Sequence, residues 1–173
     1  IAEYYGKEAT QVAETNPDEI VRSYYMREFL QQDAVEKFKQ TDFAYLRKLW
    51  RDWSPHYHCP PDEKEHIVNT FRQKGVTEAA LAYDKAALQK SSPHCNQEFS
   101  LLRELMDTQP INTPTLILYG EYDGCHGKEI IEAMPQELLP HCMKKMIKGA
   151  GHFLHLEIPE TVNNCIINFI CRE

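Results

Sequence analysis

The pattern of the sequence changes near Pro110, and this change constrains the fold more than any other feature. Residues 1–109 contain few glycines and many charged side chains, with apolar residues at the spacing of amphipathic helices. After Pro110 the pattern becomes strand, turn, helix, strand, turn, helix, which is expected of a parallel sheet. We therefore expect a helical domain at residues 1–109 and part of an α/β core at residues 110–173.

Capping signals place the first of the predicted helices. Asn16 is a good N-cap, and Pro17 and two acidic residues follow it in the first turn. This arrangement predicts a helix from Pro17 to about Leu30, with Ile20, Tyr24 and Phe29 as candidates for its buried side.

Further helices are predicted from caps and breaks in the sequence. A short helix is expected at residues 34–39, and residues 41–42 should cap the next one. After a proline-bounded loop, a helix is expected at residues 62–71. Gly75 then interrupts the pattern, and Thr77 begins the last helix of this part.

Composition and charge exclude several classes of function. The net charge of −7 and the absence of a Lys/Arg-rich cluster argue against nucleic acid as a partner. No apolar run approaches the roughly 20 residues that a membrane span requires, so no membrane partner is expected. The six cysteines have irregular spacings and form no CxxC pair, which favours reduced thiols in a cytoplasmic protein.

The histidines and cysteines do not have the spacing of a metal site. Several of them are adjacent in the sequence, but no zinc-finger spacing links these pairs. His56 and His58 lie in a proline-bounded loop, where they could chelate a metal adventitiously. Cys125 is interpreted as a packed thiol rather than a nucleophile. We expect neither a functional metal nor a cofactor.

Two turns after Pro110 carry side chains suited to hydrolysis. Asp123 follows the strand-like run 115–119, and His152 lies in a glycine-lined turn after the apolar stretch 143–147. An imidazole can take up and return a proton near neutral pH, and a carboxylate on its other nitrogen holds the required tautomer. We therefore predict Asp123 and His152 as catalytic acid and base of a triad. A nucleophile on a sharp strand-to-helix turn is not found in these 173 residues.

These segments resemble parts of a known family. Residues 113–123 resemble the acid-bearing turn of the α/β-hydrolase family, and residues 151–160 resemble its histidine loop. The acid precedes the histidine, as in that family. Four further segments resemble the cap of the epoxide hydrolase and haloalkane dehalogenase branch of this family: residues 23–29, 49–55, 71–75 and 80–83.

The resemblance implies which part of that fold the chain represents. Residues 1–109 would be the helical cap, and residues 110–173 would be the last two βα units of the parallel sheet. The N-terminal half of the core, with the nucleophile, would lie on a missing segment or on a second chain. The chain alone is therefore expected to be inactive.

The resemblance also implies a hydrolase that acts on a small-molecule substrate through a covalent ester intermediate. In epoxide hydrolases the nucleophile is an aspartate. His152, oriented by Asp123, would then activate the water that hydrolyses the ester. In esterases of this fold the nucleophile is a serine, which His152 would deprotonate directly. Esterase and dehalogenase variants remain open at this point.

One cap feature departs from the epoxide hydrolase pattern. Those enzymes use two cap tyrosines that donate hydrogen bonds to the opening epoxide oxygen. Tyr25 matches the first by motif position, so a substrate-binding role is implied for it. The second should directly precede a basic residue, but Asp84 precedes Lys85 here. Tyr83 stands one residue earlier, about 100° away around a helix.

A non-catalytic module is the alternative interpretation. A truncated hydrolase could be retained for binding through its cap, and the cap could also mediate a homodimer. However, a lone pair of parallel strands exposes an open edge and an apolar face. This argument favours an enzyme that includes the other half of the core.

Overall fold

The chain folds into helices followed by a small parallel sheet with its own helices. The computed structural model describes residues 6–88, 105 and 108–171. The first part contains α1 (Gly6–Thr15), α2 (Pro17–Arg22), α3 (Tyr24–Phe29), α4 (Ala34–Trp53), α5 (Pro61–Arg72) and α6 (Val76–Leu88). The second part contains β1 (Thr115–Gly120), α8 (Lys128–Glu132), β2 (Cys142–Ile147), α9 (Leu154–Glu157) and α10 (Pro159–Ile170). This order confirms the predicted change from helices to alternating strands and helices.

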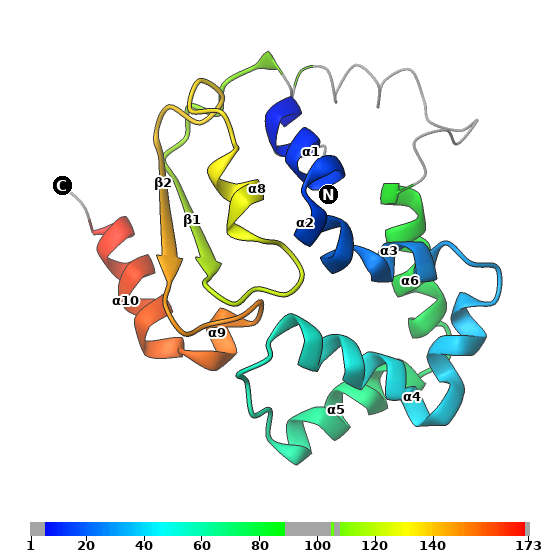
Figure 1. Cartoon of the computed structure of the whole chain (residues 1–173). Coiled ribbons are helices and arrows are strands. Elements are labelled where there is room, and N and C mark those ends of the chain that lie inside the picture. The colour runs from blue at the N-terminus through cyan, green and yellow to red at the C-terminus, as the bar shows by residue number, and fades with distance from the viewer. Residues whose placement is uncertain (1–5, 89–104, 106–107, 172–173) are drawn as a thin grey trace.

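The two strands are parallel and in register along their whole length. Thr115 pairs with Cys142 at one end, and Gly120 pairs with Ile147 at the other. Figure 1 shows α8 and α1 on one side of the strands and α10 on the other. Alternate residues of β1 accordingly enter different apolar clusters: Ile117 packs with α1 and α8, whereas Leu118 packs with α10.

The outer edge of β1 is unpaired within the described part of the chain. There, β2 is the one strand that is hydrogen-bonded to β1. Residues Thr115 to Tyr119 are only partly buried, although most of them are apolar. An apolar strand in a parallel sheet is normally covered on both faces and paired on both sides.

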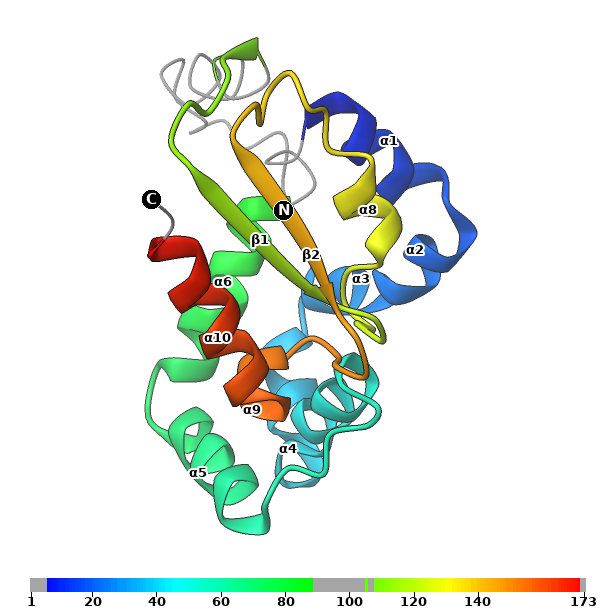
Figure 2. The ribbon, with the colours of Figure 1, turned by 90° about the vertical axis from the view of Figure 1, so that its left-hand side faces the viewer.

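Helix α1 packs against α8, next to the sheet (Figure 2). Ala9 is completely buried and shares an apolar cluster with Ile130 and Met134. The first helix of the chain thus contacts α8, far away in sequence. The division into domains at residues 1–109 and 110–173 stays a prediction.

The helix predicted from residue 17 to residue 30 is two helices. Asn16 caps α2 as predicted, since its Oδ1 accepts hydrogen bonds from the backbone N–H groups of Asp18 at 2.9 Å and Glu19 at 3.3 Å. The chain then breaks at Ser23, which ends α2 and precedes α3.

The break at Ser23 changes which side chains are buried. Ile20 is 40% exposed, so its predicted place on the buried side was wrong. Tyr24 is partly buried, while Tyr25 and Phe29 are buried in the helical core. A single helix would keep one phase throughout, but the phase restarts after Ser23.

The predicted interruption before residue 43 lies inside α4. Thr41, Asp42 and Phe43 have φ values of 50°, 53° and 60°, which divide α4 into two helical pieces. Non-glycine residues rarely adopt this left-handed region. The Asp42 carboxylate forms ion pairs with Arg47 and Arg72 that hold this corner, and Phe43 is buried against the neighbouring helices.

Aromatic side chains dominate the core of the first part. Its buried residues include Tyr25, Phe29, Phe38, Phe43, Leu46, Leu49, Val68 and Leu81. Several rings meet edge to face, with Phe29 and Phe38 centroids 5.9 Å apart. Cys125, from the turn after β1, belongs to the same cluster and connects the helices to the sheet. In the part of the chain described here, no helix is long and apolar enough to cross a membrane.

Candidate active site

Asp123 lies in the turn after β1, where backbone N–H groups of the same turn hold its side chain. Its Oδ1 accepts hydrogen bonds from the backbone N–H groups of Cys125 at 2.8 Å and His126 at 2.9 Å. Such a bond to a backbone group two residues ahead is typical of an Asx-turn. The side chain is 9% exposed, so this carboxylate is oriented before any partner approaches.

His152 faces Asp123 from the loop after β2. Its Nδ1 lies 3.0 Å from Oδ2 and 3.2 Å from Oδ1 of Asp123. A carboxylate only accepts, so Nδ1 carries the proton and donates it to this bond. Nε2 is then left as the proton acceptor. The structure therefore brings together the two residues predicted as catalytic acid and base.

The Asp123 carboxyl is stabilised in its charged form. Burial by itself would raise the pKa of Asp123, but the hydrogen bond and charge of His152 oppose this effect. Together with the backbone donors of His126 and Cys125, they hold the pKa of Asp123 below its ordinary value. The carboxylate is thus ionised wherever His152 would act as a base.

A second histidine lies beside the pair. The rings of His126 and His152 are 6.0 Å apart. Burial lowers the pKa of His126 to about 4, although the Asp123 charge opposes the shift. His126 therefore remains neutral near pH 7 and adds no positive charge next to His152.

The end of α4 holds both loops of the site. The backbone carbonyl of Trp53 accepts hydrogen bonds from the N–H groups of Gly124 and His152, each at 3.0 Å. One carbonyl therefore connects the acid turn with the histidine loop. The Trp53 ring also meets the His152 ring, with their centroids 5.3 Å apart.

Ser54 extends this connection with its side chain. Its hydroxyl donates to Glu157 Oε1 at 2.7 Å and accepts from the Phe153 N–H at 3.0 Å. Glu157 Oε2 accepts from the Gly151 N–H at 2.9 Å. The two residues that flank His152 are therefore tied to one buried hydroxyl and one carboxylate, which restrict how the imidazole can move.

Two glycines permit this close approach. A Cβ atom on Gly151 would lie 2.7 Å from Ser54 Cα, and one on Gly124 would overlap the Asp52 carbonyl. Both glycines are therefore required by the contact between α4 and the sheet loops.

Tyr25 is buried beside the acid turn. Its hydroxyl lies 3.4 Å from Cys125 Sγ, and its ring packs edge-on against Trp53 at 5.1 Å. Burial raises the pKa of Tyr25 far above its ordinary value, so the phenol keeps its proton. Burial also raises the pKa of Cys125 to about 12, which fits a packed thiol. The predicted substrate-binding role of Tyr25 stays a prediction.

Tyr83 and Asp84, adjacent residues of α6, lie in different surroundings. Tyr83 is 76% exposed, and its ring faces solvent. Asp84 follows Thr77 and Leu81 on the buried face of α6 and is partly buried. Its charge acts on both Tyr25 and Cys125, so it lies on the side of the acid turn. Burial raises the pKa of Asp84.

A cavity of about 410 Å³ adjoins the pair of catalytic candidates. Asp123, His126 and His152 form its polar side, and residues of β1 form its apolar side. Ligand sites commonly enclose roughly 300 to 1,000 Å³ with a few polar groups among apolar ones. The unpaired strand β1 thus bounds the cavity next to His152.

The described residues show no arrangement suited to a metal ion. Among them, no three His, Cys, Asp or Glu side chains gather at one place that could hold one. His56, considered as an adventitious ligand, instead packs its ring against Tyr122, with centroids 4.5 Å apart. His58 is exposed.

Sequence reasoning did not find the contributions of Trp53, Ser54 and Glu157. Residues 49–55 were singled out only because they resemble a cap motif. The role of Trp53 depends on its backbone carbonyl, which every residue type possesses, so no side-chain signal could reveal it. Ser54 lies before a proline and looks like an ordinary helix terminator.

Comparison with known proteins gives one curated relative. Over 65 residues the chain is 31% identical to carboxylesterase YbfK of Bacillus subtilis (strain 168), covering 38% of this chain and 22% of that protein. No family model matches the sequence.

Solved structures match nearly the whole chain. An epoxide hydrolase of Bacillus megaterium in complex with an inhibitor superposes with a TM-score of 0.69 and 20% identity, over 95% of this chain and 57% of that one. A point mutant of the Bacillus megaterium enzyme, bound to its product, gives a TM-score of 0.75 and 24% identity over the same shares. A protein of Nostoc sp. PCC 7120 described as an α/β hydrolase gives 0.73 and 21%, over 97% and 56%.

These matches confirm the resemblance and the fold class indicated by the sequence. The chain has the fold of the C-terminal part of an α/β hydrolase with a helical cap. It spans 22% of the length of the curated relative and somewhat more than half of the solved structures.

Proposed function

We propose that this chain is the cap and C-terminal part of a hydrolase, in which Asp123 and His152 belong to a nucleophile–His–Asp triad. The hydrogen bond between His152 Nδ1 and Asp123 Oδ2 at 3.0 Å carries this proposal. Both residues follow the carboxyl ends of parallel strands, where ligands bind in open α/β sheets. The similarity to epoxide hydrolases and to a carboxylesterase supports it.

The proposed reaction proceeds through a covalent ester. In the epoxide hydrolase form, a carboxylate nucleophile attacks an epoxide carbon, the carbon–oxygen bond breaks, and the ring oxygen takes a proton from a neighbouring acid group. His152 Nε2 then removes a proton from water, whose oxygen attacks the ester carbonyl. The imidazolium gives this proton to the alkoxide that leaves as the diol, and the nucleophile returns the first proton to the acid group. Asp123 stabilises the imidazolium that forms. In the esterase form, His152 deprotonates a serine before the ester forms.

The open edge of β1 is an argument that further strands pair with this sheet. Its apolar residues are partly exposed, and the cavity beside Asp123 and His152 is bounded by this strand. We propose that the N-terminal half of an α/β-hydrolase core, in the same chain or a second one, pairs with β1 and supplies the nucleophile. A binding module without catalysis is the alternative. A cytoplasmic location and a homodimer through the cap stay predictions.

Replacement of His152 by Gln in the complete protein tests the triad and identifies the nucleophile. Turnover of ester and epoxide substrates should fall by about a thousandfold or more, because glutamine cannot shuttle a proton. An aspartate nucleophile needs no base for its first step, so the H152Q protein should then accumulate a substrate adduct visible by intact mass spectrometry. With a serine nucleophile, no adduct should accumulate.

His155 provides the matched control for this experiment. It lies three residues from His152 and is exposed, so His155→Gln should retain turnover. Undiminished turnover in a folded H152Q protein would refute the assignment. A complete protein without hydrolase activity towards either substrate class would favour the binding module.

A further inference from the structure

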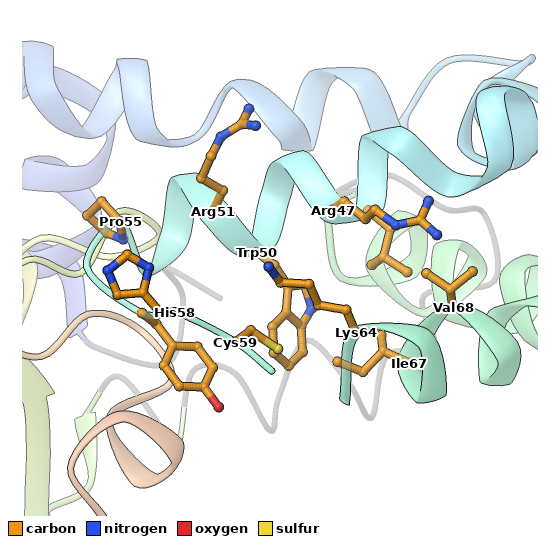
Figure 3. Close-up of a pocket in the computed structure, with 11 residues that line it drawn as sticks. Arg47, Trp50, Arg51, Pro55, His58, Cys59, Lys64, Ile67 and Val68 are labelled. Atoms are coloured by element: carbon orange, nitrogen blue, oxygen red, sulfur yellow. The ribbon is translucent and has the colours of Figure 1, made fainter. Parts of the chain in front are cut away.

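A second cavity lies within the cap, apart from Asp123 and His152. It encloses about 360 Å³ between α4, α5 and residues 54–60 (Figure 3). It shares no lining residue with the cavity at the catalytic candidates. Its volume falls within the range of small-molecule sites.

The floor of this cavity is apolar. Leu46 and Trp50 of α4, Pro55, and Ile67 and Val68 of α5 form it. The indole of Trp50 is also stacked against Phe153, with centroids 4.1 Å apart and an interplanar angle of 25°. Trp50 is thus held in position and offers the cavity a rigid aromatic surface, which is well suited to an apolar ligand.

Four side chains with basic groups line the cavity. They are Arg47, Arg51, His58 and Lys64, and the phenol of Tyr57 and the thiol of Cys59 line it as well. No aspartate or glutamate contributes to the lining. The lining thus differs in sign from the chain as a whole, which has a net charge of −7.

The basic groups differ in how far nearby acids offset their charges. Arg47 is paired with Asp42 and with Glu65. Arg51 has an exposed side chain with one distant contact to Asp52 at 3.7 Å. Lys64 has no ion pair with any residue that the structure describes.

Lys64 is therefore the cation best placed for a ligand. Lys64 of α5 and Trp50 of α4 both line the cavity (Figure 3). An ammonium group next to an indole surface can hold an anionic head while the ring contacts an apolar body. Both acids next to Lys64 in the sequence have other partners: Glu63 accepts a hydrogen bond from Tyr57 Oη at 2.8 Å, and Glu65 pairs with Arg47 and Arg72.

We propose that this cavity binds a small anionic amphiphile, namely a monocarboxylate with an apolar body. The carboxylate would meet Lys64, and the chain would lie on Trp50 and Ile67. Charge complementarity decides in favour of this occupant over a neutral one. The proposal does not depend on the triad, because neither the nucleophile nor His152 takes part in the binding.

Calorimetric titration of the complete protein with octanoate tests the proposal. We expect saturable one-to-one binding at low salt, which weakens as salt is added. Lys64→Met keeps the aliphatic stem but removes the charge, and should weaken octanoate binding about fivefold. Binding of uncharged octan-1-ol should be unaffected by K64M.

Lys74 provides the matched control. It is exposed in the turn between α5 and α6 and does not line the cavity, so Lys74→Met should leave octanoate binding unchanged. Octanoate should also shift the indole N–H resonance of Trp50 more than that of Trp53.

Several results would overturn the proposal. These are equal affinity for octanoate and octan-1-ol, equal weakening by K64M and K74M, or no binding at millimolar octanoate. Equal affinity for inorganic phosphate would also overturn it, because an amphiphile site requires the apolar body. A protein that binds octanoate as expected but fails the His152 test would retain this site without the proposed activity.

Discussion

Tyr83 and Asp84 are adjacent in the sequence but have opposite surroundings. Tyr83 faces solvent, whereas Asp84 lies on the side of α6 that faces Tyr25 and the acid turn. Burial raises the pKa of the Asp84 carboxyl above its ordinary value.

The burial of Asp84 predicts a pH-dependent effect of Asp84→Asn. Because the native pKa is raised, the ionised carboxylate destabilises the folded state at neutral pH. Below about pH 4, the ordinary pKa of aspartate, the group is protonated in both states and this cost vanishes. The D84N protein should therefore be more stable than the native protein at pH 7 and equally stable near pH 3.

Urea denaturation of both proteins at several pH values measures this difference. The gap should open as the pH rises above about 4 and become constant above the native pKa of Asp84. A gap that is largest at pH 3 would show that Asp84 is stabilised as a carboxylate.

At the scale of elements, local signals account for most of the helices. The cap at Asn16, the corner at residues 41–43 and the positive φ of Gly75 all lie where the sequence indicated. The break at Ser23 was missed, because serine is tolerated within a helix and no proline or glycine marks the site. A single helix phase was therefore assumed across Ser23, and it placed Ile20 on the buried side.

Ser54 lies where α4 meets the loop before α9, so we expect Ser54→Ala to lower the stability of the folded protein. The substitution leaves the partly buried Phe153 N–H without its acceptor and removes a hydrogen bond from Glu157. The free energy of unfolding should fall by about 1–3 kcal/mol. Chemical denaturation measures it, with Ser23→Ala as control, whose hydroxyl makes one exposed bond to the Ile20 carbonyl. Equal losses in the two proteins would contradict the role assigned to Ser54.

At the scale of the whole molecule, the two parts of the chain depend on each other. α1 covers α8 through Ala9, and the Trp53 carbonyl connects both loops of the candidate site. The acid turn also receives Glu19 of α2, whose Oε2 accepts from the Gly127 N–H at 3.3 Å. The sheet and its loops are therefore incomplete without the helices before them.

This dependence predicts that residues 111–173 do not fold in isolation. The segment would expose the unpaired edge of β1 and the apolar surface that α1 covers. We expect an aggregated or molten state with a poorly dispersed amide spectrum. The complete protein serves as the reference, and a well-dispersed spectrum of the isolated segment would disprove the dependence.

The sequence by itself determined the order of helices and strands, the positions of Asp123 and His152 on two turns, and the departure at Asp84. Caps, prolines, glycines and apolar periodicity act within a few residues, so these features can be inferred locally. Only the tertiary structure decided that one Trp53 carbonyl joins both turns, that Ser54 supports the histidine loop, and that the basic residues of α4 and α5 line one cavity. These contacts join segments far apart in the chain, and backbone groups carry no side-chain pattern from which their partners could be inferred.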